Sequence, residues 1–215
     1  MTRPSFRLTL LLLLLVAAPS ARLSAQIFSG LGDAAPGEDG VSIGLIYGQM
    51  SPQTKFRDGG TFDNSRVLGL SVGFWPAKYV GFQVSMMNTN HVGLPATDGR
   101  SSVVSGRDPR IGTYLVDLVG RMPLMPGGRM TVSPYLLLGG GWKSYDFKWD
   151  TKGGPDARGL DLTWSPGAGV EARFGAQHRL GLRGEFRQLN TKMERWGDKL
   201  TFQDRVFTGG LLINF

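Results

Sequence analysis

Two glycine-rich motifs and two histidines are the residues of this sequence whose types and spacing could do chemistry. Residues 69–73 read G-L-S-V-G, the G-x-S-x-G spacing that surrounds a nucleophilic serine, here Ser71. Residues 167–172 read G-A-G-V-E-A and satisfy a relaxed dinucleotide-binding fingerprint. His91 and His178 are the two histidines, and the chain has no cysteine. A thiol nucleophile, a disulfide and a cysteine-ligated metal are therefore excluded, and two histidines leave little for a histidine metal cage.

The context of both motifs argues against catalysis. A nucleophile elbow needs a sharp strand-to-helix turn, whereas Ser71 lies in the middle of an alternating pattern that no helix follows. The second motif also lies within a strand pattern and lacks the acidic residue expected about twenty positions later. We therefore predict no catalytic residue, no metal ligand and no cofactor. A His–Ser–Glu arrangement stays open, because folding brings distant residues together.

A different set of residues carries charge of both signs within segments that otherwise alternate small with apolar residues. Isolated charges are costly to bury, but opposite charges on neighbouring strands can pair. The sequence therefore predicts a charge network inside the fold, made of Asp117, Arg121, Glu171, Arg173, Arg183, Glu185 and Arg187.

The elements that would position these residues are β-strands. Glycine accounts for 32 of 215 residues, about twice the usual share of roughly 7%, and glycine disfavours helix interiors. From Val41 onward the hydrophobic period is two, which is typical of strands. We predict eight strands, at about 41–50, 65–75, 79–88, 111–122, 129–145, 160–174, 178–189 and 201–215. Short connections near 76–78, 123–128 and 175–177 alternate with longer ones near 51–64, 89–110, 146–159 and 190–200, as in an up-and-down barrel.

Residues 1–25 are expected to lie outside this fold. Arg3 and Arg7 precede an apolar run of eleven residues, and residues 23–25 offer a cleavage site, so the segment reads as a secretory signal peptide cut before Gln26. Eleven apolar residues are too few for a membrane-spanning helix. Cleavage removes three arginines and no acid and lowers the net charge from +7 to +4. Residues 26–40 read as a flexible lead-in and 41–215 as one domain.

The bulk of the alternating residues decides which face points outward. An eight-stranded barrel has an interior only just wide enough for side chains. One face of these strands carries glycine, serine, threonine and charge, and the other carries leucine, valine and aromatics. The bulky face must point outward, which is stable only in lipid, where closure satisfies every backbone hydrogen bond.

Aromatic residues gather near both predicted rims, as the aromatic girdles of a membrane barrel do. Tyr79, Phe174 and Phe215 lie near the rim with short turns. Near the rim with long loops lie Tyr47, Tyr114, Trp164, Phe186 and Phe207.

Together these features resemble the small eight-stranded outer-membrane β-barrels of Gram-negative bacteria, of the OmpA-transmembrane, OmpX and opacity-protein type. The resemblance covers about 41–215. It is carried by the signal peptide, by SPYLLLGGGW at 133–142, by GAGVEARF at 167–174 and by the last strand, FTGGLLINF, which ends at Phe215. The resemblance implies a bacterial outer-membrane location, with the termini in the periplasm and four loops outside. It also implies that Phe207, Leu211, Ile213 and Phe215 form the signal that the barrel assembly machinery recognises.

The leading functional hypothesis is a non-enzymatic outer-membrane protein with a structural, adhesive or surface-interaction role. The alternatives are a narrow pore or small-molecule conduit and, less favoured, a lipid-modifying outer-membrane enzyme. The expected partners are outer-membrane lipids, lipopolysaccharide and the assembly machinery, with the protein a monomer. Nucleic acid is disfavoured, because the mature charge is modest and no basic cluster is interleaved with aromatics.

Overall fold

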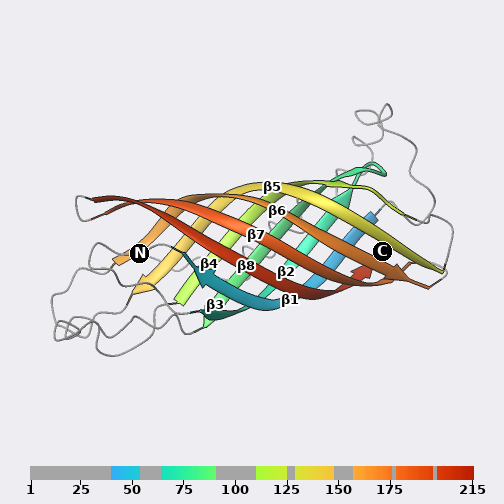
Figure 1. Cartoon of the computed structure of the whole chain (residues 1–215), viewed down its shortest axis with the longest axis horizontal. Coiled ribbons are helices and arrows are strands. Elements are labelled where there is room, and N and C mark those ends of the chain that lie inside the picture. Colours follow the sequence, from blue (N-terminus) through green and yellow to red (C-terminus); the bar gives the residue numbers. More distant parts are fainter. Residues whose placement is uncertain are drawn as a thin grey trace.

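The protein is a closed barrel of eight antiparallel β-strands (Figure 1). A computed structural model describes residues 40–53, 64–90, 110–124, 129–147, 157–175, 178–195 and 198–215. The strands are β1 (Gly40–Pro52), β2 (Ser65–Trp75), β3 (Val80–Asn90), β4 (Arg110–Arg121), β5 (Met130–Phe147), β6 (Ala157–Phe174), β7 (Leu180–Arg195) and β8 (Asp198–Asn214). The predicted signal peptide and most of the predicted lead-in lie outside the described residues. In the part of the chain that is described, no helix is long and apolar enough to cross a membrane.

Each strand pairs with its neighbour in sequence, and β1 pairs with β8 to close the sheet. This confirms the predicted fold class, an eight-stranded up-and-down barrel. The registers also fix how far the strands are staggered. Partners followed once around the barrel from Ile43 are Val72, Val84, Val116, Gly140, Trp164, Asn190 and Gln203. Ile43 pairs directly with Ile213, ten residues further along β8 than Gln203. A stagger of this kind tilts the strands against the barrel axis, as closure requires.

The outward face of the strands is apolar, as the sequence predicts. Leu136 is 69% exposed, Leu162 68% and Leu211 60%, values that would be unfavourable against water over so wide a surface. Aromatic side chains are exposed near both rims, including Tyr79, Phe174 and Phe215 at one end and Tyr47, Tyr114, Trp142, Trp164, Phe186 and Phe207 towards the other. The barrel therefore presents an apolar surface with aromatic side chains near its two ends, the pattern of a lipid-facing barrel.

The interior differs in part from the prediction, because it is not filled by small and charged residues alone. Towards the end with the long connections, eight buried apolar residues form a cluster: Met50, Val67, Met87, Ile111, Leu115, Leu189, Phe202 and Val206. A second apolar cluster comprises Trp75, Val119, Tyr135 and Leu137. Bulky side chains fit inside because β5 and β6 face them with small residues, such as Gly139, Gly141 and Ser165.

The strand ends follow the predictions closely at the short turns and depart from them at the opposite end. Gly175, in the turn after β6, has φ +90°, a left-handed conformation that glycine adopts without strain. The prediction of a long loop at 190–200 is wrong, since β7 and β8 stay paired up to Arg195 opposite Asp198. The β7–β8 hairpin reaches beyond the other strands at the end away from the C-terminus (Figure 1).

The outward face of this extension becomes polar, which explains why hydrophobic periodicity missed it. Phe186 and Phe207 pack against each other with their ring centroids 4.8 Å apart. Beyond them, the outward positions of β7 and β8 carry Gln188, Lys192 and Arg205. About 9–11 residues suffice to span a bilayer, whereas β7 and β8 have 16 and 17. The hairpin therefore continues past the apolar zone into a polar environment.

Inward glycines allow large interior groups to approach the barrel wall. A Cβ added to Gly139 would collide with the carboxylate of Asp117 on the neighbouring strand. The next residue, Gly140, points outward, and a Cβ there would meet nothing within 4 Å. The two glycines are therefore neighbours on β5, but Gly139 faces the lumen and Gly140 faces outward.

This difference predicts opposite outcomes for one substitution at adjacent positions. Gly139→Ala is expected to lower the free energy of unfolding by about 1–3 kcal/mol, because the added methyl group displaces the Asp117 carboxylate. Gly140→Ala should leave stability unchanged or slightly raised. Urea unfolding of the refolded protein in detergent micelles measures both. Equal effects at the two positions would contradict the interior packing described above.

Candidate functional site in the barrel lumen

The centre of the lumen is crossed by a buried arginine bound to carboxylates on two strands. Arg187, on β7, donates from Nη1 to both carboxylate oxygens of Asp117 on β4, at 2.8 and 2.9 Å. Its Nε donates to Glu185, and its Nη2 donates to Ser85 Oγ on β3 at 3.3 Å. Asp117 is 0% exposed and Arg187 1%. Strands β4 and β7 are not neighbours in the sheet, so the Asp117–Arg187 pair spans the interior rather than running along the wall.

Further hydrogen bonds connect this pair to the arginines nearer the short turns. Gln83 donates to Ser85 Oγ at 3.1 Å and accepts from Arg183 Nη1. Arg183 Nη2 donates to Glu171 Oε2 at 3.0 Å, and Glu171 also pairs with Arg173. From the wall at β5, Tyr135 donates to Glu185 Oε2 at 2.8 Å. We call the connected set the lumen network: Gln83, Ser85, Asp117, Tyr135, Glu171, Arg173, Arg183, Glu185 and Arg187.

The lumen network is balanced in charge. It holds three carboxylates, on Asp117, Glu171 and Glu185, and three guanidinium groups, on Arg173, Arg183 and Arg187. All six residues are no more than 8% exposed. Buried charges of this kind are tolerated only when they are paired and hydrogen-bonded.

A second buried ion pair lies nearer the apolar cluster at the end with the long connections. Lys143, on β5, pairs with Asp204 on β8, and their side chains are 1% and 2% exposed. Strands β5 and β8 are also not neighbours, so this pair too crosses the interior. Neither residue is among the predicted lumen charges, although each occupies an inward position of its strand. The alternation of β8 around Thr208 and Gly210 would have placed Asp204 inside.

Six of the seven residues of the predicted charge network belong to the lumen network, and the seventh, Arg121, makes different contacts. Arg121 donates from Nε to the Lys78 carbonyl oxygen at 2.9 Å. Its guanidinium stacks on Trp75, 3.8 Å from the ring centroid. Sequence reasoning missed Gln83, Ser85 and Tyr135, which are uncharged but lie on the inward faces of β3 and β5.

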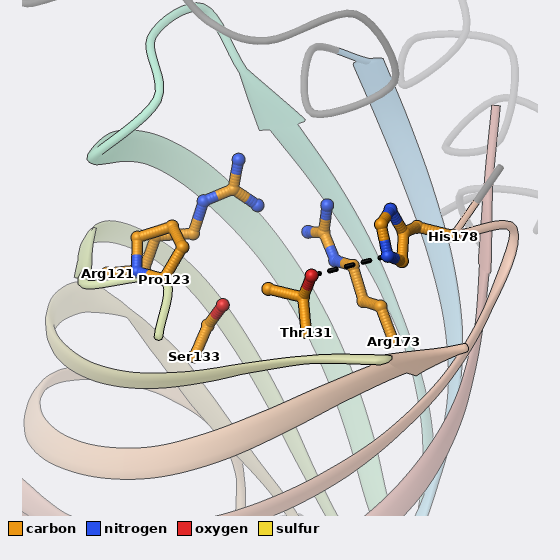
Figure 2. A pocket seen from close by; sticks show the side chains of 6 residues that line it. All are labelled: Arg121, Pro123, Thr131, Ser133, Arg173 and His178. Atoms are coloured by element: carbon orange, nitrogen blue, oxygen red, sulfur yellow. Dashed lines mark hydrogen bonds between the residues drawn. The ribbon is translucent and has the colours of Figure 1, made fainter. Parts of the chain in front are cut away.

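A small pocket lies at the rim with the short turns, beside Arg121. Its lining comprises Arg121, Pro123, Thr131, Ser133, Arg173 and His178 (Figure 2). Thr131 and His178 form a hydrogen bond, with 3.3 Å between Oγ1 and Nε2. His178 precedes β7 and has φ +49°, and its ring lies beside Thr131 (Figure 2).

The motifs considered for catalysis lie elsewhere. Ser71 lies within β2 with its side chain 3% exposed, so the G-x-S-x-G match does not form a strand-to-helix elbow. The 167–172 match lies within β6. His91 lies outside the described residues.

The residues expected to signal assembly lie together on the outer face of β8. Phe207 is 55% exposed, Leu211 60%, Ile213 49% and Phe215 72%. They alternate with the inward Leu212 and Asn214, which are buried. The four residues therefore form one row that faces away from the lumen.

The Asp117–Arg187 pair gives a direct test of the interior. Arg187→Met is expected to lower the free energy of unfolding by about 3–5 kcal/mol, because it leaves buried carboxylates without their partner. The control Arg205→Met changes an exposed arginine on β8 and should cost less than about 0.5 kcal/mol. Adding Asp117→Asn to Arg187→Met should recover part of the loss. Equal stability of the Arg187 and Arg205 variants would refute a paired interior.

Comparisons with known proteins agree with this architecture. A family model described as "Outer membrane protein beta-barrel domain" matches residues 8–215. A comparison with curated proteins finds no match. Among solved structures, Neisserial surface protein A (NspA) is similar, with 12% identity, a TM-score of 0.51 and coverage of 83% of this chain and 97% of that one. The outer membrane protein OprG from Pseudomonas aeruginosa has 16% identity, a TM-score of 0.51 and coverage of 85% and 99%.

At these identities the two structures speak for the fold, whereas the family match spans nearly the whole sequence. The chain belongs to the outer-membrane protein β-barrel family, and it is a bacterial outer-membrane protein.

Proposed function

We propose that this protein is a non-enzymatic outer-membrane barrel with a closed lumen, which acts through its surface in a structural, adhesive or surface-interaction role. The observation that carries the proposal is the lumen network. Its Asp117–Arg187 and Gln83–Arg183 contacts join strands on different sides of the barrel. Ions would have to displace these buried pairs to pass.

The apolar cluster at the other end supports the same proposal. Its eight members come from six strands, and none is more than 3% exposed. Water and ions therefore meet an apolar layer on one side of the lumen network and the Trp75–Arg121 stack on the other. A conduit for solutes would need both to move aside, so the proposed role lies in what the barrel presents outside.

Electrical recording separates this role from the pore hypothesis. We expect wild-type protein to give no stepwise current above background in planar bilayers. A double variant, Glu185→Ala with Arg187→Ala, removes one charge of each sign from the centre. Because the apolar cluster and the Trp75–Arg121 stack remain, it is also expected to give no stepwise current. The heat-dependent shift in gel mobility verifies that both proteins are folded. Regular current steps from wild-type protein would overturn the closed-lumen proposal.

We also propose that the outward row on β8 serves as the signal for assembly into the outer membrane. Its support is its position on the strand that closes the barrel against β1. Because these four side chains point away from the lumen, another protein can bind them before β8 pairs with β1.

Phe215→Ala is expected to reduce the amount of folded barrel in outer-membrane fractions while leaving refolding into micelles unchanged. Phe174→Ala is the matched control, because it removes an outward aromatic from the same rim on β6, where Phe174 is 38% exposed. Equal losses in cells for the two variants would speak against a specific signal.

A further inference from the structure

We propose that the pocket at the rim with short turns binds a phosphate group, one oxygen of which enters the cavity between Arg121 and Arg173. The cavity volume is about 10 Å³, room for one water-sized group. A phosphate oxygen has that size, and the rest of the group would remain at the rim.

The composition of the pocket suits an anion. Among the described residues, its lining has two arginines, a histidine, two hydroxyl side chains and a proline, and no carboxylate. Figure 2 shows the guanidinium groups of Arg121 and Arg173 and the ring of His178 on one side of Thr131 and Ser133. Guanidinium groups bind phosphate oxygens through charge-assisted hydrogen bonds, and hydroxyl groups add further donors.

A buried guanidinium nitrogen independently supports an anion at this position. Arg173 is 5% exposed, and within the described ranges its Nη2 has no hydrogen-bond partner. Its Nε is occupied by Glu171. A buried guanidinium nitrogen without an acceptor is costly and calls for an ion or a water. An oxygen in the adjoining cavity would supply the acceptor.

The distribution of charge favours an ion over a water. Glu171 is the carboxylate that pairs with Arg173, but it is shared with Arg183. Within the described residues, the part of the lumen network that adjoins the pocket therefore has two guanidinium groups for one carboxylate, and Arg173 has no carboxylate to itself. A phosphate oxygen beside Arg173 would offset this local difference in charge.

The pocket lies at the ends of β4, β5 and β6 and at the start of β7, where the barrel leaves the membrane. Both a phospholipid headgroup and free phosphate could reach this position. Both ligands present a phosphate oxyanion to the pocket, so the two sources have to be tested separately.

The experiment follows the ring resonances of His178 by NMR in the full barrel, held in a phosphate-free detergent. One arm titrates inorganic phosphate, and the other adds phosphatidylglycerol, with diacylglycerol as a lipid that lacks phosphate. We expect saturable shifts of the His178 resonances with phosphate, with phosphatidylglycerol or with both, and none with diacylglycerol. A response to inorganic phosphate identifies a free anion as sufficient, and a response to the phospholipid alone identifies a headgroup site.

Two variants and two controls connect the response to the pocket. Arg173→Gln and Arg121→Gln are each expected to weaken binding about tenfold or more, the loss typical of a charge-assisted hydrogen bond. Arg129→Gln and Arg179→Gln remove exposed arginines near the same rim and should leave binding within about twofold, as expected for surface charges. The gel-mobility shift shows that each variant is folded. No saturable shift in either arm, or equal weakening by all four variants, would overturn the proposal.

Discussion

Closure of a narrow sheet is the constraint on which the rest of this structure depends. Pairing of β1 with β8 leaves the spanning part of the sheet without a free edge, so its backbone groups are satisfied inside lipid. Closure also fixes the size of the lumen, which eight strands leave only wide enough for side chains. Every inward residue must therefore fit against residues from the opposite wall. Glycines such as Gly139 make room, and charged residues are accepted where a partner of opposite sign reaches them.

The lumen network follows from that constraint. Arg187 is long enough to reach Asp117 on a strand that is not its neighbour, and it also binds Glu185 on its own strand. The three carboxylates and three guanidinium groups leave the lumen network neutral as a whole. Under the proposed function, the same contacts that make the interior compatible with burial also close it to ions. Stability and a closed lumen would then be consequences of one arrangement.

Much of the fold was predictable because the period of two marks each strand, and the glycine content and the bulk of the alternate residues together decide which face is inside. The same alternation placed Arg183, Glu185 and Arg187 on one face. It could not identify their partners, since the Asp117–Arg187 contact depends on the stagger around the whole barrel. Nor did the alternation reveal the apolar cluster. Leu115 and Leu189 have the bulky apolar side chains expected on the outward face, but their positions in the strands point them inward. The polar outer face of the β7–β8 hairpin made strand residues resemble a loop.

The most direct test of the central claim, a lumen closed by paired charges, is the chemical accessibility of its middle. The chain has no cysteine, so Ser85→Cys introduces a single thiol where Ser85 donates to Asp117 Oδ2, with 3.2 Å between the two oxygens. The rate of its reaction with a water-soluble, membrane-impermeant maleimide can be compared with that of Gln49→Cys, at an exposed position of β1. A closed lumen predicts that the Ser85→Cys thiol stays unmodified in the folded barrel and reacts only after denaturation. Modification of the folded protein at the rate of Gln49→Cys would contradict it.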